Sequence, residues 1–364
     1  MHKGNTQLQY GGIIQKNTRK LPLIVTVTFL LLFLLISITL GIMIGPVKIE
    51  PHLIWRIALV KAAILETWIN PDWTSVQENI VWHIRVPRVL LGAVVGAGLS
   101  VTGVAIQALV RNPLADPYIL GVSSGASVMA TLVILFGLFG ALGQFALSMG
   151  AFLGALLSVI TVYVLARVGG RISSTKLLLS GVALSLMLNA ATNLIVMMAP
   201  REMGIRSALF WIMGSLAGAK WSYLIIPAFI VTIGTIFLLC YHRPLNALLL
   251  GDEAAVTLGV DVDKLRKLLV VISSLIAGAV VAVSGAIGFI GLMIPHIARI
   301  LVGSEHRRVL PVSILLGSSF TIWADVFARM ALSPEELPLG VITALLGGPF
   351  FIWILQKNGQ YCGG

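Results

Sequence analysis

The sequence predicts an all-α polytopic membrane protein with about ten transmembrane helices. Hydrophobic residues make up 58% of its 364 residues, charged residues make up only 11%, and the mean hydropathy is +0.99. Soluble domains carry about 25% charged residues, so most of this chain is expected to lie in lipid or against helices that do. Apolar segments long enough to cross a bilayer recur along the chain, and no soluble domain is indicated between them.

The apolar segments assign the elements in order, with roughly 17–25 residues for each crossing. The division is plain except in 267–302, where Ser284–Gly288 is the predicted turn because glycine permits a tight reversal. Together the segments form one transmembrane domain over 22–356, between tails at 1–21 and 357–364. The predicted spans are 22–45, 88–110, 117–138, 143–166, 176–198, 221–241, 267–286, 287–302, 309–328 and 338–356.

The first span and the segment after it have informative flanks. Lys16, Arg19 and Lys20 precede an apolar run that exceeds the roughly 7–15 residues of a cleavable signal, so a retained helix is predicted. The outer segment 46–87 is expected to hold a short helix at the membrane surface, because tryptophans favour that interface. These tryptophans are Trp55, Trp68, Trp73 and Trp82.

The lysines and arginines orient the chain. With the N-terminus inside, 16 of the 25 basic residues fall in cytoplasmic segments, and five of the other nine belong to 46–88, where the rule is weaker. Both termini are therefore predicted to be cytoplasmic. The net charge of +11 is assigned to these basic loops, because no basic patch with interleaved aromatics indicates nucleic-acid binding. Cys240 and Cys362 would both be cytoplasmic, so no disulfide framework is expected.

The stretch Arg85–Gly125 contains a glycine-rich apolar helix. Its glycines are too many for a helix that only faces lipid, and small residues let neighbouring backbones approach closely. We therefore expect this helix to run through the middle of the bundle, as a packed and candidate substrate-lining element. The glycines are Gly92, Gly96, Gly98 and Gly103.

Patterns that would indicate catalysis are absent from the sequence. It contains no G-x-x-x-x-G-K-[ST] loop for nucleotide phosphates and no H-E-x-x-H zinc motif. His296 stands alone after Pro295, so packing is preferred to metal ligation, because metal ligands come in sets. Asp325 lies inside a predicted span, where acids are functional candidates, and pairing with Arg329 at i+4 is preferred to proton transfer. No catalytic residue, metal site or bound cofactor is predicted.

The inner segment 242–266 contains a short predicted helix on the cytoplasmic face. Asp252 and Glu253 complement the positive start of a helix, and Gly259 supplies a left-handed stop. A docking element and a solvated surface turn both fit this pattern. The residues of the candidate docking element are Gly251, Asp252, Glu253, Ala254, Leu258 and Gly259.

Five long motifs follow one another along the chain. They are RVPRVLLGAVVGAGLSVTGVAIQALVRNPLADPYILGVSSG (85–125), RISSTKLLLSGVAL (171–184), GDEAAVTLGV (251–260), SGAIGFIGLMIPHIARILVGSEHRRVLP (284–311) and ELPLGVITALLGGPFFIWIL (336–355). In this order and spacing they resemble the permease subunit of ATP-binding-cassette importers for iron–siderophores, haem and cobalamin. The resemblance runs from about residue 80 to 356; before it, only a helix and an unusually long outer loop match.

The resemblance implies the type II importer permease fold, in a bacterial plasma membrane. It implies a second copy of the chain or a close paralogue, two ATPase subunits that use ATP and Mg, and an extracytoplasmic substrate-binding protein. The helix at 252–258 would be the element that docks on the ATPase. Ferric siderophore is the expected cargo because it is the commonest in the family, with haem or cobalamin as alternatives. An ATP-independent channel or secondary carrier is the alternative class.

The resemblance also implies a cytoplasmic gate. Asn112 and Leu114 end the central helix, and Ser174 and Thr175 open the fifth, where they match the constriction of the family. Across a dimer axis, Leu114 would form an apolar plug with small polar neighbours. Ordinary helix punctuation is the competing interpretation, because Asn-Pro is a good helix stop and Ser-Thr a good start.

The pathway is expected between the second, fifth and tenth helices, with Gln107, Asn189 and Asn193 along it. The two asparagines share a helix face at i and i+4. Buried amides need partners, so these side chains either bond between helices or face a water-filled passage.

Three arginines lie at predicted outer helix ends, against the preference for basic residues inside. They are Arg85, Arg88 and Arg329. They match positions where the family presents arginines to acidic residues of the binding protein, and guanidinium groups suit that contact. The alternative is that Arg85 and Arg88 reach lipid headgroups while Arg329 pairs with Asp325.

Overall fold

The computed structural model describes residues 22–47, 49–61, 72–168 and 171–359. The predicted tail at 1–21 lies outside these residues. In chain order the elements are α1 (Leu23–Met43), α2 (Pro51–Lys61), α3 (Ser75–Glu78), the π-helix η1 (Asn79–Arg85), α4 (Val86–Val110), η2 (Pro117–Leu120), α5 (Val122–Phe136), η3 (Gly140–Phe145), α6 (Ala146–Ala166), β1 (Arg167–Val168), β2 (Arg171–Ile172), α7 (Ser174–Met197), α8 (Glu202–Ile212), α9 (Trp221–Cys240), α10 (His242–Leu249), α11 (Asp252–Thr257), α12 (Val262–Ser284), α13 (Ile290–Val302), α14 (His306–Met330) and α15 (Leu339–Gly359).

The predicted spans are confirmed as helices. Eight helices of the described residues are long and apolar enough to cross a membrane, and the shorter apolar helices α5 and α13 occupy the two remaining predicted segments. The predicted turn in 267–302 is also confirmed. Helix α12 ends at Ser284, Gly285 follows with φ of 66°, and α13 begins at Ile290.

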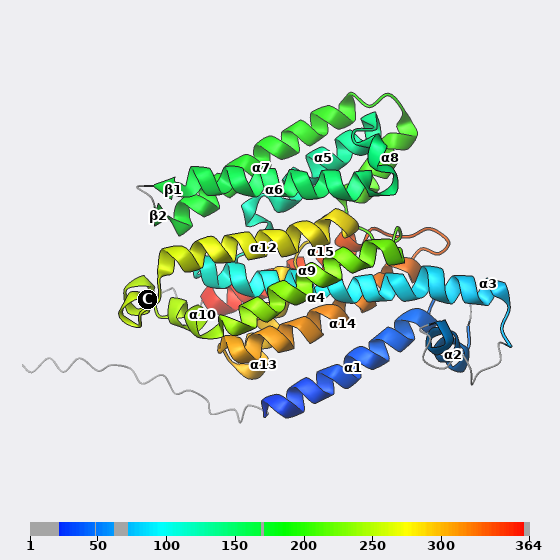
Figure 1. The fold of residues 1–364 in the computed structure, drawn as a ribbon, viewed down its shortest axis with the longest axis horizontal. Coiled ribbons are helices and arrows are strands. Elements are labelled where there is room, and N and C mark those ends of the chain that lie inside the picture. Colours follow the sequence, from blue (N-terminus) through cyan, green and yellow to red (C-terminus); the bar gives the residue numbers. More distant parts are fainter. Residues whose placement is uncertain (1–21, 48, 62–71, 169–170, 360–364) are drawn as a thin grey trace, which may run out of the picture.

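The helices lie roughly along one direction in three layers (Figure 1). Helices α5, α6, α7 and α8 form one outer layer, α1, α13 and α14 form the other, and α4, α9, α12 and α15 lie between them. Helix α10 and the hairpin of β1 with β2 lie at one end, which we call the α10 end. Helices α2, α3 and α8 lie at the opposite end, which we call the α8 end.

Helix α4 is the central helix, as its glycines predict. It is buried along nearly its whole length. A Cβ at Gly96 would lie 2.1 Å from the carbonyl oxygen of Gly317 on α14, and one at Gly103 would lie 1.9 Å from that of Gly291 on α13. Only glycine permits such close backbone contact. These contacts hold α4 directly against α14 and α13.

Several short elements were not predicted from the sequence. Helix α8 and helix α10 lie between spans, and β1 pairs with β2 in a hairpin of two residues a strand. The surface helix expected in 46–87 is present as α2, with Trp55 on it 43% exposed. Trp68 lies outside the described residues. Short amphipathic helices carry too few residues for a clear hydrophobic period.

Candidate functional site: polar clusters at the two ends

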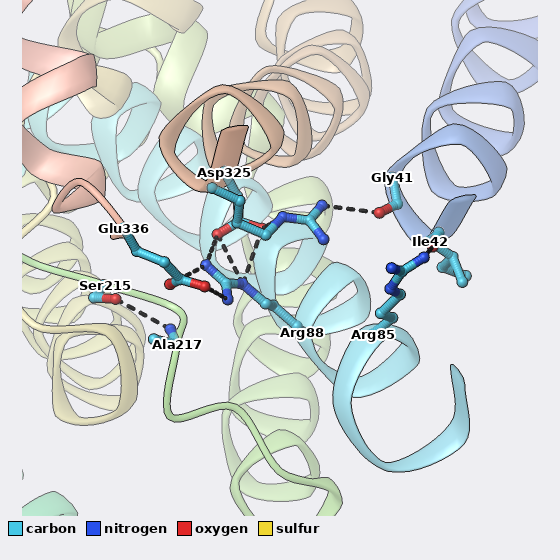
Figure 2. Close-up of polar contacts among 9 residues, drawn as sticks. Gly41, Ile42, Arg85, Arg88, Ser215, Ala217, Asp325 and Glu336 are labelled. Atoms are coloured by element: carbon cyan, nitrogen blue, oxygen red, sulfur yellow. Dashed lines mark hydrogen bonds and ion pairs between the residues drawn. The ribbon is translucent and has the colours of Figure 1, made fainter. Parts of the chain in front are cut away.

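Arg88 is the centre of a charged cluster at the α8 end (Figure 2). Its Nε donates to both carboxylate oxygens of Asp325, at 3.0 and 3.1 Å, and its Nη2 donates to Oδ1 of Asp325 at 2.9 Å. Nη1 and Nη2 also donate to the two carboxylate oxygens of Glu336, at 2.8 and 2.9 Å. All three nitrogens of the planar guanidinium thus donate to two carboxylates, a multidentate arrangement that favours arginine.

The other two arginines of the cluster hold the end of α1. Arg85 donates from Nη1 to the carbonyls of Ile42 and Met43, at 2.9 and 3.0 Å, and from Nη2 to that of Val47. Arg329 donates to the carbonyl of Gly41 at 2.8 Å. The last carbonyls of a helix have no partners within it and carry partial negative charge, so cations stabilise them.

Arg329 also pairs with Asp325, at 3.2 Å between Nε and Oδ2. The predicted i,i+4 pairing of these two residues is therefore confirmed. Asp325 lies between two guanidinium groups, and its side chain is only 3% exposed. We call Arg85, Arg88, Arg329, Asp325 and Glu336 the arginine cluster. It joins α1, α4, α14 and the segment before α15.

The arginine cluster bears on the predicted docking of a binding protein. The relative exposures of Arg85, Arg88 and Arg329 are 4%, 7% and 5%. The donors of Arg85 and Arg88 are directed at other groups of the chain (Figure 2). Arg329 likewise donates to a backbone carbonyl of the chain. Docking stays a prediction. It requires that Arg88 bind a carboxylate of the binding protein in addition to Glu336, whose side chain is 33% exposed.

Sequence reasoning missed Glu336. Three arginines at one end need more carboxylate than Asp325 supplies, and Glu335 and Glu336 are the acids immediately before α15. That charge imbalance was the available signal. Both glutamates also line a cavity of about 970 Å³ at the α8 end, together with Arg206, Trp211 and Ser215. In Figure 2, Ser215 and Ala217 lie beside Glu336 on a neighbouring segment.

The predicted gate residues lie at the end of α4 and at the start of α7. Helix α4 ends at Val110, and Oδ1 of Asn112 accepts a hydrogen bond from the backbone N–H of Leu114 at 2.9 Å. The Ser174 hydroxyl donates to the carbonyl of Leu109 at 3.4 Å, and Thr175 is exposed beside it. The start of α7 therefore touches the end of α4. These contacts are also those of ordinary helix punctuation, so the gate stays a prediction.

The predicted docking helix is present as α11. Gly251 precedes it with φ of 104°, Asp252 and Glu253 lie in its first turn, and Gly259 follows it with φ of 81°. The predicted left-handed stop is thus confirmed. Leu258 and Glu253 are exposed, and Ala254 is half-buried. The carboxylate of Asp252 accepts two hydrogen bonds from Nη2 of Arg266, at 3.1 and 3.0 Å.

The predicted pathway residues occupy two different environments. Gln107 is 2% exposed, its Nε2 donates to the carbonyls of Gly291 and Leu292, and Arg299 donates to its Oε1 at 2.5 Å. Within this chain Gln107 therefore bonds between helices, and sequence reasoning missed Arg299. Asn189 and Asn193 are exposed on one face of α7 and line a cavity of about 480 Å³ with Ser127, Thr192 and apolar side chains.

Residues with metal-binding side chains are dispersed. No group of three His, Cys, Asp or Glu side chains comes together within the described residues. The ring of His296 packs edge-on against Phe350, with 6.0 Å between ring centroids. The preferred packing role of His296 agrees with this contact.

Comparison with known proteins gives matches over most of the chain. The FecCD transport family matches residues 31–357. The cobalamin import system permease protein BtuC of Halobacterium salinarum is 45% identical over 279 residues, 77% of this chain and 74% of that protein. The hemin transport system permease protein HmuU of Yersinia pestis is 40% identical over 292 residues, 79% of this chain and 87% of that protein. A solved metal-chelate-type ABC transporter in an inward-facing conformation has a TM-score of 0.78 at 31% identity, covering 91% of this chain and 98% of that one.

Proposed function

The chain belongs to the FecCD transport family, and from that premise we propose that it imports a metal–organic complex, with cobalamin as the first substrate to test. Proteins of this family are the membrane permease subunits of ABC importers, and the chain has the type II importer permease fold. The single observation that carries the proposal is the family match, which takes in every predicted span from within α1 to α15.

The substrate proposal rests on the named relatives. Permeases named for cobalamin and for haemin are 45% and 40% identical to this chain over most of its length. Cobalamin is placed first because the more similar of these two relatives is named for it. The ferric siderophore expected from the sequence stays a prediction, since no named relative supports it over the other two cargoes.

The exposed face of α7 that carries Asn189 and Asn193 supports a second copy of the chain against it. Leu186, Met187 and Leu194 are exposed there beside Asn189 and Asn193. Lipid alone would leave the two amides without hydrogen-bond partners, whereas a facing copy or close paralogue can enclose them in a wet passage. A wall of amides and apolar side chains suits a bulky ligand that has both kinds of surface.

The energy would come from other subunits. The sequence has no loop for nucleotide phosphates, so ATP and Mg would be used by two ATPase subunits that dock on α11. The α10 end would then face the cytoplasm with both termini, and the α8 end would receive the substrate-binding protein. Arg85, Arg88 and Arg329 are proposed to contribute to that docking through the charge of the arginine cluster.

The proposal is tested by isolating the complex and by titrating its binding protein. Co-expression of the tagged permease with its partner ATPase is expected to yield a stable complex, with the ATPase bound at the α10 end. Gly259→Val is expected to reduce the yield of this complex, because valine disfavours the left-handed backbone conformation that ends α11. A Gly137→Val variant is the matched control, because Gly137 also has positive φ but lies in the connection after α5.

Tryptophan fluorescence of the cognate binding protein is then titrated with cyanocobalamin, haemin and a ferric hydroxamate siderophore. Tightest binding of cyanocobalamin is expected. Binding of none of the three metal complexes would contradict the substrate class, and tighter binding of haemin or the siderophore would replace cobalamin within it.

A further inference from the structure

Asp252 is the meeting point of three elements at the α10 end. It lies in the first turn of α11, and both of its carboxylate oxygens accept from Nη2 of Arg266 on α12, at 3.1 and 3.0 Å. The same carboxylate lies 3.7 Å from Nη1 of Arg111, the residue that immediately follows α4. We call these three residues the Asp252 junction. One side chain therefore connects α11 both to α12 and to the central helix.

Arg111 is attached to a stiff part of the chain. Its backbone is left-handed, with φ of 55° and ψ of 38°, which is uncommon for a residue other than glycine. Its N–H bonds to the carbonyl of Ala108, and the N–H of Asn112 bonds to that of Gln107, which closes the helix end. Arg111 immediately precedes the predicted gate residues Asn112 and Leu114. A displacement of Arg111 is therefore a displacement of this segment.

The start of α11 also lies in ordinary contact with the Arg111 side chain. A Cβ placed on Gly251 would be 3.6 Å from Nη1 of Arg111. Gly251 has φ of 104°, which L residues rarely adopt, so the chain enters α11 through a conformation that favours glycine. The start of α11 is thus connected to the end of α4 through the Arg111 side chain.

The two contacts of Asp252 differ in their exposure. The Arg266 side chain is 8% exposed, whereas those of Arg111 and Asp252 are 42% and 38% exposed. Solvated ion pairs are weak and reform easily, while a sheltered pair with two hydrogen bonds is harder to break. The junction therefore holds α11 firmly on α12 and loosely on α4.

We propose that Asp252 is a positioning residue that couples movement of α11 to the gate end of α4, through a contact with Arg111 that forms in one state of the transporter and breaks in another. This inference rests on the proposed function, in which a docked ATPase moves α11. The pair of Asp252 with Arg266 makes α11 and α12 move as one body. The contact with Arg111 then transmits that movement to the segment that contains Leu114.

The test measures ATP-dependent crosslinking at the gate. Cys240 and Cys362 are first replaced by serine, and Leu114→Cys is introduced into the complete complex with its ATPase and binding protein in liposomes. Disulfide formation between the two copies is followed with and without MgATP. Asp252→Asn, Arg111→Gln and Asp252→Glu are compared in this background. Glu305→Gln is the matched control, since Glu305 also pairs with an arginine at the α10 end, at 2.8 Å from Arg308.

The parent complex is expected to change its crosslinking rate at least about fivefold with MgATP, the lower end of typical coupling between sites. Asp252→Asn and Arg111→Gln are expected to reduce that change to less than about twofold. Arg111 lies outside the docking helix, so Arg111→Gln is also expected to retain bound ATPase and its hydrolysis of ATP. Asp252→Glu is expected to restore the gate response in part, because the charge is kept. Retained hydrolysis with a lost gate response is a result that a merely structural role would not produce.

Arg111→Gln keeps the pairing of Asp252 with Arg266, so it decides the outcome if Asp252→Asn fails to assemble. A full gate response in assembled Arg111→Gln overturns the inference, as does an equal loss in Glu305→Gln. Failure of the ATPase to bind the parent chain, or a parent gate that ignores MgATP, overturns the proposed function and the inference with it. The two failures are therefore distinguishable in the parent measurement.

Discussion

Each end of the bundle places arginines on a carboxylate, but the two arrangements differ in depth. At the α8 end, the side chains of Asp325, Arg329 and Arg88 are 3%, 5% and 8% exposed, and Asp325 serves both guanidinium groups. At the α10 end, Asp252 and Arg111 are 38% and 42% exposed. The same pair of side-chain types is thus buried in one place and solvated in the other.

This difference separates an anchor from an adjustable contact. A buried ion pair is costly to break because the partner left behind is an uncompensated charge in low dielectric. A solvated pair contributes little to stability, so it can change partners during a functional cycle. The arginine cluster therefore holds α1, α4 and α14 in fixed relation, while the Asp252 junction is suited to movement.

The largest expected effect is on stability, from Asp325→Asn. This change leaves Arg88 and Arg329 with one carboxylate between them, and loss of one partner from a buried ion pair costs about 3–5 kcal/mol. The free energy of unfolding in mixed micelles, measured with the isolated permease, checks this. Glu335→Gln is the control because Glu335 is exposed at the same end. Equal stability of the two variants would contradict the anchor.

A smaller change is expected from Glu336→Gln, which neutralises the more exposed carboxylate of the arginine cluster. Arg88 keeps Asp325, so the permease is expected to lose only about 1 kcal/mol, typical of a partly solvated pair. The freed charge on Arg88 should tighten docking of the binding protein, measured by surface plasmon resonance at several salt concentrations. Affinity equal to that of Glu335→Gln at all of them would argue against docking through Arg88.

A pH dependence is expected from Asp116, which is buried in the connection between α4 and η2. Burial raises the pKa of this carboxyl from 3.8 to about 6. The pKa of Asp116 is thus higher in the folded than in the unfolded protein, so its protonated carboxyl stabilises the folded state. This contribution to the free energy of unfolding is complete below about pH 4 and is lost as the pH rises through about 6. Thermal midpoints of the parent and Asp116→Asn should therefore converge at low pH and separate above it. A constant difference from pH 4 to 8 would reject this origin.

The smallest stability effect is expected from Asp252→Asn. Its contact with Arg111 is solvated, and an amide can still accept from Arg266, so the loss should be about 1 kcal/mol or less. Unfolding in mixed micelles, under the conditions used for Asp325→Asn, compares the two ends directly. A loss as large as that at Asp325 would show that the Asp252 junction is a second anchor, and the contrast between the ends would disappear.

Patterns among neighbouring residues predicted the helices and turns. They did not predict contacts between residues that are far apart in the sequence. Span lengths, the turn at Gly285 and the stop at Gly259 follow from hydropathy and backbone conformation, which are properties of neighbouring residues. The pairing of Asp325 with Arg329 was accessible because the two share a helix face. Glu336, in contrast, lies 248 positions from Arg88. No period or motif connects residues so far apart.

The site predictions divide in the same way. Asn189 and Asn193 share one face of α7, as their i,i+4 spacing predicts, and both are exposed on it. Their place along the pathway stays a prediction. The amide of Gln107 is bonded to carbonyls of α13 and to Arg299 on the same helix. Its place along the pathway stays a prediction. Depth within a bundle depends on which helices pack against which, and a single sequence does not contain that information.

Under the proposed function, this permease moves a metal–organic complex only when an ATPase drives it. The direct measurement is uptake of radiolabelled cyanocobalamin, haemin or a ferric siderophore into liposomes that contain the complete complex, with the loaded binding protein outside and MgATP inside. We expect accumulation that requires MgATP and stops when the ATPase is inactivated. Uptake at the same rate without ATP, or by the permease alone, would identify a channel or secondary carrier and contradict the account.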